Sequence, residues 1–438
     1  MSSTNTHPAK NLFVLLNKPV LPFIIIVICV TVSFINAQKL LPLFPTNDLG
    51  PRIAGAVAIT EKKSAYFYNQ PGVPADSLTI LNGCTITPFA ILLHYPLKFL
   101  TSCSVREVWL VIEYLLLLAC CIIAVMLTPQ ATGKYLLCIC FALFFLFSKY
   151  WLMHLVLGQI HILYAFLFFV LYGLKVKDKN FLFGLVLAFT IACRPLFAPA
   201  VIMLFLWYNK KSLYGLAAGC VFLVLFNVFS GSTRYWMEYA RAVKMYSLQI
   251  PADAHPEIAF KKPVTYLEPC TALQNTTTGD AKKINGLFNG LSRPAGLIKT
   301  IEDYLVANNI IITNTVYYSA VMLALAVLLI LLAKNRIKTM PANKFLCLLF
   351  LIYITSEICT PAPRGPYNFM LWMFGAFLII SGKDYRGIIL LFIGLALNYD
   401  HPYIHHGREW GEALMLLAGF LLLFSNGLSI SGKKHAIT

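Results

Sequence analysis

The sequence predicts an all-α integral membrane protein in which residues 1–438 form a single polytopic domain. Hydrophobic residues make up 59% of the chain and charged residues only 12%, whereas soluble domains carry about 25% charged residues. Because so few charges cannot cover a water-facing surface of this size, lipid must cover much of it. Apolar runs recur along the chain between short basic segments, which predicts about 10–12 transmembrane helices.

The formal net charge of +17 fits this topology. In a soluble protein such a charge would indicate a nucleic-acid partner, but the chain has no basic helix or aromatic-basic module of the kind that binds nucleic acid. Short loops rich in Lys and Arg stay in the cytoplasm. We therefore expect membrane lipids, and no nucleic acid, among the partners.

The first element resembles a secretory signal sequence. Lys10 and Lys18 precede a long apolar run, but Ile35 stands where cleavage would require a small residue. We therefore expect an uncleaved first helix over residues 20–37.

Further apolar runs predict the remaining spans, some of them shorter than the roughly 20 residues of a straight span. They cover residues 106–127, 134–152, 159–174, 181–207, 213–230, 312–333, 343–360, 366–381, 386–399 and 411–430. The run 181–207 is interrupted by Arg194, Pro195 and Pro199 and has basic flanks on both sides. It predicts a broken pair of helices that starts and finishes in the cytoplasm, as occurs where helices line a cavity.

The short basic segments contain almost no acids, with Asp178 and Asp384 as the exceptions. This asymmetry predicts a plasma (inner) membrane protein with both termini in the cytoplasm. Two long segments, 38–105 and 231–311, then lie outside. Within them, residues 87–100 predict a helix on or dipping into the outer leaflet, and residues 230–246 predict an amphipathic interfacial helix.

Most of the 12 cysteines lie inside apolar runs, where they serve as small packing residues. Cys84, Cys103, Cys270 and Cys359 fall in or near external segments, and a disulfide among them is left open. The cluster of Asp400, His401, His405 and His406 has some resemblance to a zinc site, but a polar external turn is favoured, so no metal is expected. No cofactor-binding motif occurs in a supporting context, and no cofactor is expected.

Two candidate site residues stand in the first external segment. Asp48 follows the first helix, where a carboxylate near the membrane face could act as a general base on a sugar hydroxyl. It also precedes Pro51 and a helical run, which is typical of a helix N-cap. Arg52 is a candidate contact to a substrate phosphate.

The other candidates lie at helix ends on the external side. Gln159 and His161 share one turn at the start of a predicted helix and could hydrogen-bond a polar ligand, or simply form a helix-end turn. Arg194 lies inside an apolar run, where an arginine is costly and faces a cavity or a partner. It is a candidate for binding a lipid phosphate, and pairing with Glu113 or Glu357 is the alternative. Arg364 and Tyr367, in a proline-rich turn, are further candidates for phosphate binding or for a solvated turn.

Taken in order, these pieces resemble a known family. The Asp48 segment, the stretch TPFAILLHYPLKFL (87–100), Gly158-Gln159, the break CRPLFAP (193–199), RYWMEYARAV (234–243), INGLFNGLSRP (284–294) and TPAPRGPYNF (360–369) follow one another as in glycosyltransferase family 87. These are membrane enzymes of the GT-C class, which include polyprenyl-phosphate-mannose-dependent mannosyltransferases and arabinofuranosyltransferases. The resemblance spans roughly residues 20–380 and is diffuse. In place of the family's Ser-Pro motif with paired histidines, this chain has Thr360-Pro361, Arg364 and Tyr367.

The resemblance implies a GT-C-like helical bundle and a hexosyl- or pentosyltransferase of a cell envelope glycan. The donor would be a polyprenyl-phosphate sugar, the acceptor a lipid or glycan, and the site would face the outside or periplasm. Asp48 would be the base of an inverting transfer, with Arg194 or Arg364 stabilising the departing lipid phosphate.

Two alternatives remain open at this stage. Broken helices and intramembrane charge also suit a transporter or flippase of lipid-linked or small polar substrates. A polymerase or ligase of surface polysaccharide would place its chemistry in the segment 231–311.

Overall fold

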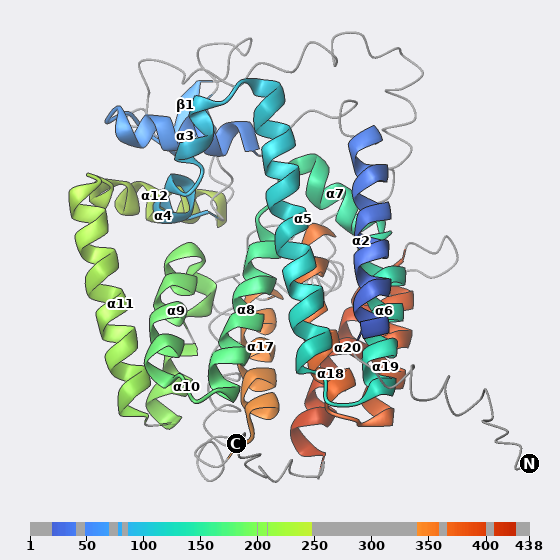
Figure 1. Cartoon of the computed structure of the whole chain (residues 1–438). Coiled ribbons are helices and arrows are strands. Elements are labelled where there is room, and N and C mark those ends of the chain that lie inside the picture. The colour runs from blue at the N-terminus through green and yellow to red at the C-terminus, as the bar shows by residue number, and fades with distance from the viewer. Residues whose placement is uncertain are drawn as a thin grey trace, which may run out of the picture.

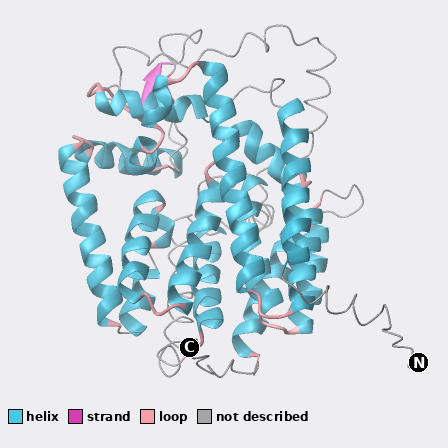
Figure 2. Ribbon diagram, viewed as in Figure 1, coloured by secondary structure: helices cyan, strands magenta, loops and turns pink. Residues whose placement is uncertain are grey.

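The computed structural model describes residues 20–40, 49–69, 78–80, 86–198, 200–207, 209–247, 340–358, 366–399 and 407–425. Nearly all of them are helical, as Figure 2 shows, so the expectation of an all-α protein is confirmed. The exception is a short antiparallel ladder between β1 (Phe67–Asn69) and β2 (Leu78–Ile80). The predicted span 312–333 lies outside the described residues.

Most helices run side by side and form a bundle (Figure 1). In chain order they are α2 (Val20–Leu40), α5 (Ser102–Leu127), α6 (Ala131–Phe141), η3 (Ala142–Leu146), α7 (Lys149–Leu157), α8 (His161–Val176), α9 (Asn180–Cys193), η4 (Pro195–Phe197), α10 (Ala200–Trp207), α11 (Lys210–Phe229), α17 (Ala342–Ile358), η8 (Pro366–Leu371), α18 (Trp372–Ser381), α19 (Tyr385–Leu397) and α20 (Gly407–Phe424). Each described span predicted from the sequence coincides with one or more of these helices.

A smaller set of elements lies at one end of the bundle, and we call it the cap (Figure 1). It consists of α3 (Leu49–Thr60), the β1–β2 ladder, α4 (Pro88–Leu92), the 3₁₀ helix η2 (Tyr95–Phe99) and α12 (Thr233–Ser247). The helical segments predicted at 87–100 and 230–246 are therefore present, the first as two short pieces. Their contact with the membrane surface stays a prediction.

Three described helices are long and apolar enough to cross a membrane, namely Val20–Lys39, Ser104–Leu127 and Lys210–Phe229. A fourth span arises if the bent pair Ala131–Leu146 and Lys149–Leu157 is taken as one. Six further apolar helices are shorter, between 10 and 17 residues. The structure is thus a helical bundle with several candidate membrane spans.

The predicted span 134–152 is bent by 54°. A π turn at η3 widens the helix, and Ser148 then starts α7 by accepting a hydrogen bond from the backbone N–H of Trp151 at 3.1 Å. A π turn followed by a capping serine ends one helix and begins another. The expected break at Arg194 is also present, since α9 ends at Cys193 and α10 begins at Ala200.

Helices α9 and α11 approach each other closely because glycines line their contact. A Cβ atom on Gly184 would lie 1.9 Å from the carbonyl oxygen of Ser212, and one on Gly215 would lie 1.9 Å from that of Phe181. In lipid, where apolar surfaces gain little by leaving the solvent, such close backbone packing is a main source of helix association.

The end of the bundle opposite the cap carries the basic turns, and we call it the lysine-rich end. The connections from α5 to α6, α8 to α9, α10 to α11 and α18 to α19 all lie there (Figure 1). Lys175 lies 3.2 Å from the ring centroid of Trp207, and Lys344 donates to the carbonyl oxygen of Leu423 at 3.0 Å. The lysines of the described turns between these helices are therefore gathered at one end.

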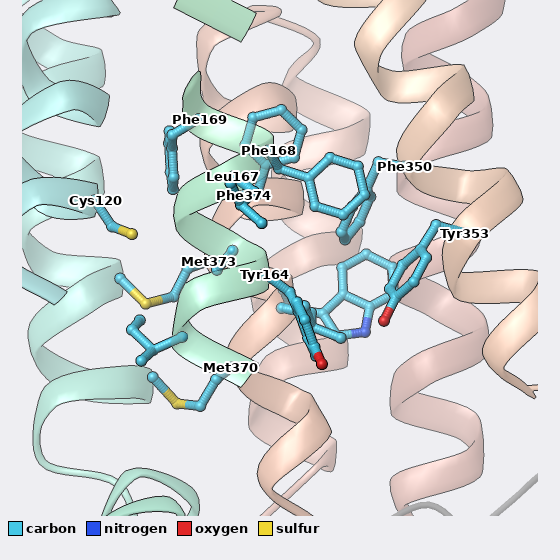
Figure 3. Packing of buried hydrophobic residues seen from close by; sticks show 14 of the residues in the cluster. Cys120, Tyr164, Leu167, Phe168, Phe169, Phe350, Tyr353, Met370, Met373 and Phe374 are labelled. Carbon is cyan, nitrogen blue, oxygen red and sulfur yellow. The ribbon is translucent and has the colours of Figure 1, made fainter. Parts of the chain in front are cut away.

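Aromatic packing holds α8, α17 and α18 together (Figure 3). The ring of Phe168 lies 5.1 Å from that of Phe374 and 5.3 Å from that of Phe350. Phe197 of η4 stacks on Tyr353 of α17 at 4.0 Å. This packing fixes the middle of α8 against the middle of α17.

The described cysteines behave as the sequence predicts. All are free, and most are buried among apolar side chains. Cys84, Cys270 and Cys359 lie outside the described residues, as does the side chain of Cys103.

Candidate functional site

The site is built around the turn that joins α7 to α8. Gly158 ends α7 in the left-handed conformation, with φ of 64°, and the next residue, Gln159, donates its backbone N–H to the carbonyl oxygen of His154 at 2.9 Å. A Cβ atom on Gly158 would lie 2.7 Å from Cβ of Leu49, the first residue of α3. Glycine is therefore required for two reasons, the positive φ and the close approach of the cap.

Arg52 ties the cap to this turn. Its guanidinium donates to the carbonyl oxygen of Gly158 through Nη1 and to Oε1 of Gln159 through Nη2, the latter at 2.7 Å. The Arg52 side chain is buried, at 3% exposure. Two candidates predicted from separate segments, Arg52 and Gln159, therefore belong to one hydrogen-bonded cluster.

Arg194 reaches the same turn from the other side. It stands at the break after α9 with an extended backbone and a buried side chain. Its Nη1 donates to Nε2 of His161 at 3.2 Å, and its Nη2 pairs with Glu357 on α17. Tyr353 also donates to Glu357, at 3.1 Å. Of the two acids considered as partners of Arg194, the structure selects Glu357.

The other acid, Glu113 of α5, pairs with His154. Its Oε1 lies 3.1 Å from Nδ1 of His154, and both side chains are almost completely buried. His154 was not among the residues singled out from the sequence. The signal that identifies it is its place in an apolar helix next to the Gly158 turn, since an ionisable residue within a membrane helix is a functional candidate.

Aromatic rings complete the cluster. The Tyr367 ring centroid lies 4.8 Å from that of His161, and the Arg194 guanidinium lies 5.4 Å from the Tyr164 ring centroid. Five of the seven predicted site residues are thus gathered around the α7–α8 turn: Arg52, Gln159, His161, Arg194 and Tyr367. Asp48 and Arg364 lie outside the described residues, as do Asp400, His401, His405 and His406.

The cluster presents hydrogen-bond donors more readily than a base. Glu357 pairs with Arg194, and Glu113 with His154. Nε2 of His154 is occupied by the backbone N–H of Ile162 at 3.2 Å. Because arginine donates only, Nε2 of His161 must accept from Arg194, so this nitrogen is also engaged. Among the described residues the cluster therefore offers guanidinium N–H groups, while both of its carboxylates are paired.

In the part of the chain that the structure describes, no group of three or more His, Cys, Asp or Glu side chains is arranged to hold a metal ion.

Comparison of the chain with models of protein families, with curated proteins and with solved structures finds no match in any of the three.

Proposed function

We propose that the protein is an inverting membrane glycosyltransferase that moves a sugar from a polyprenyl-phosphate donor to a lipid or glycan acceptor. The observation that carries the proposal is the convergence of Arg52 and Arg194 on the single turn that bears Gln159 and His161. The proposal includes about 10–12 membrane spans with both termini in the cytoplasm. The site then faces the outside or periplasm, at the cap end.

The buried arginines suit a donor that carries a phosphate. A guanidinium group offers planar paired N–H donors that match phosphate oxygens, and burial strengthens that attraction. Arg194 is aligned by Glu357 and by the ring of Tyr164, and its Nε has no hydrogen-bond partner among the described residues. Gln159 and Tyr367 would contact the sugar beside the phosphate.

The proposed reaction is a direct displacement. The acceptor hydroxyl oxygen forms a bond to the anomeric carbon while the bond from that carbon to the phosphate oxygen breaks. Asp48 takes the hydroxyl proton, and the lipid phosphate leaves with the bonding electron pair. Asp48 suits the base because both described acids of the cluster are already paired, and because it directly precedes Leu49, which lies against Gly158.

The test is sugar transfer in isolated membranes from radiolabelled polyprenyl-phosphate sugars, with Asp48→Asn compared with the unmodified protein. Loss of transfer of at least about a hundredfold is expected for removal of a general base, with expression and thermal stability near normal. Asp384→Asn makes the same chemical change at the N-cap of α19, at the lysine-rich end. It should leave transfer intact, because Asn also caps helices. Full transfer by Asp48→Asn would rule out the base assignment.

A transporter or flippase is the second candidate, and two features favour it. The run from α9 to α10 is broken next to a buried Arg194–Glu357 pair, and the pair α6–α7 is bent by 54°. Broken helices around a buried charge are common at transport sites. Movement of a labelled polyprenyl-phosphate sugar across proteoliposomes without any transfer product would favour this candidate over the enzyme. The polymerase or ligase alternative depends on the segment 231–311, of which residues 248–311 lie outside the described residues.

A further inference from the structure

Helix α8 receives its N-terminal cap from a side chain of the preceding helix. The residue at its own cap position, Ile160, makes no side-chain hydrogen bond. Instead Nε2 of His154, on α7, accepts the backbone N–H of Ile162 at 3.2 Å. The N–H groups of a first helical turn have no partner within the helix, so this bond satisfies one of them.

This bond determines the tautomer of His154. Because Nε2 accepts a hydrogen bond, the proton of the neutral ring must be on Nδ1. Nδ1 lies 3.1 Å from Oε1 of Glu113 on α5. The two atoms are in electrostatic contact but make no hydrogen bond, so the carboxylate faces the imidazole, and the imidazole caps the first turn of α8.

His154 also holds the other side of the turn, since its carbonyl oxygen accepts the N–H of Gln159 at 2.9 Å. The side chains of Gln159 and His161 then point to different arginines: Oε1 of Gln159 contacts Arg52, and Nε2 of His161 contacts Arg194. A rotation of this turn would separate both contacts at once.

We propose that Glu113 and His154 are positioning residues that hold the α7–α8 turn in the geometry required for binding the phosphate-bearing donor. This inference rests on the proposed function for its kinetic consequences. Its structural part is independent of function. It consists of the hydrogen bonds from Ile162 and Gln159 to His154, which we call the clamp, together with the electrostatic contact between His154 and Glu113.

Two amide substitutions separate the two contacts of the His154 ring, the hydrogen bond from Ile162 and the contact with Glu113. In His154→Gln the side-chain oxygen takes the place of Nε2 and still accepts from Ile162. In His154→Asn the side-chain amide takes the place of Nδ1, so the contact with Glu113 remains but the cap on α8 is lost. Glu113→Leu removes the carboxylate.

Tyr114→Phe is the matched control. Tyr114 is the neighbour of Glu113 on α5, and its hydroxyl contacts Ser33 at 2.8 Å and accepts from Trp151 at 3.0 Å. The substitution therefore removes buried hydrogen bonds next to Glu113 but keeps the Trp151 ring, which stacks on the His154 ring at 5.1 Å, and the bond from Ile162 to His154. It should lower the thermal stability of the protein slightly and leave the donor KM unchanged.

The first readout is hydrogen exchange of the peptide that spans residues 158–165, measured by mass spectrometry in detergent micelles. We expect exchange to rise by about tenfold in His154→Asn, as for the loss of a buried hydrogen bond. The rise should be smaller in Glu113→Leu, which removes an electrostatic contact and leaves the bond from Ile162 to His154 in place. It should stay near wild type in His154→Gln and Tyr114→Phe. Unchanged exchange in His154→Asn, or an equal rise in Tyr114→Phe, would overturn the clamp.

The second readout is the donor KM in the transfer assay. His154→Asn should raise the donor KM by about tenfold, and His154→Gln should restore most of that loss. If exchange rises but KM does not, the positioning role is wrong. If exchange rises as expected while the wild-type protein transfers no sugar, the clamp is supported and the proposed function fails separately.

Discussion

Gly158 is the residue on which the contact between the cap and the bundle depends. It combines a left-handed backbone with a Cβ position 2.7 Å from Leu49. Its carbonyl oxygen also accepts a hydrogen bond from the Arg52 guanidinium. One residue therefore fixes the chain reversal, the distance to α3 and the position of a buried charge.

Gly158→Ala should lower stability by about 1–3 kcal/mol, because a side chain disfavours the positive φ and would also clash with Leu49. Thermal unfolding in detergent measures the effect. Gly173→Ala is the control, since Gly173 lies within α8 with nothing within 4 Å of its Cβ position. There the substitution should stabilise the helix slightly. Equal stability of the two variants would contradict the assigned role of Gly158.

Arg194 and Glu357 form a buried pair that joins the α9 break to α17. Removing one partner leaves the other charge buried, so Arg194→Met or Glu357→Met should each destabilise the protein by about 3–5 kcal/mol. The double substitution should cost less than the sum of the two single ones, because neither charge then remains buried alone. A double-mutant cycle on thermal stability measures the coupling, and additive effects would show that the pair contributes little.

At the scale of elements, the segment formed by α4 and η2 carries a buried histidine. Thr87 caps α4 by accepting the N–H of Ala90 at 3.1 Å, and Nδ1 of His94 lies 2.9 Å from the carbonyl oxygen of Ala90. The His94 ring packs on Trp109 of α5 at 4.9 Å. Burial, together with the nearby charge of Arg52, lowers the pKa of His94 to about 3.

The lowered pKa of His94 predicts acid sensitivity of this segment. The folded state resists protonation of His94. The contribution of the neutral ring to the free energy of unfolding is therefore fully present above the ordinary histidine pKa of about 6.5. It decreases by up to about 1.4 kcal/mol per pH unit as the pH falls from there toward 3. His94→Asn keeps a donor near Nδ1 but does not titrate, so its melting temperature should fall less steeply between pH 7 and pH 4. Parallel curves for the two proteins would contradict the assignment.

At the scale of the whole molecule, the basic turns and the candidate site lie at opposite ends. The basic turns gather at the lysine-rich end, and the arginine cluster lies at the cap end. If basic turns stay in the cytoplasm, the cluster must face the other side of the membrane. On the proposed function, the donor would then reach the cluster from the outer leaflet.

Reporter fusions test this orientation. Alkaline phosphatase fused after Lys177, in the turn between α8 and α9, should be inactive because it stays in the cytoplasm. The same enzyme fused after Lys62, at the end of α3 in the cap, should be active. A fluorescent protein that folds only in the cytoplasm should give the reverse pattern. Activity of phosphatase at Lys177 would invert the topology and place the cluster inside.

The sequence by itself determined where the described helices lie and where one of them breaks. Apolar run length and composition are local properties, and the prolines beside Arg194 end a helix whatever packs against it. The turn at Gly158 was predictable from the sequence too, because it separates two apolar runs, which is also a local property. The bend between α6 and α7 was not, because a π turn leaves the apolar composition of the run unchanged.

Only the tertiary structure decided which polar side chains meet. Arg52 contacts Gln159 across 107 residues, and Arg194 selects Glu357, 163 residues away, rather than Glu113. The packing of α5 against α7 places Glu113 3.1 Å from the His154 ring, and this contact is not encoded in either helix alone. A helical pattern specifies the face that a residue occupies, but the partner on the next helix depends on how the helices pack, and that is a property of the whole chain.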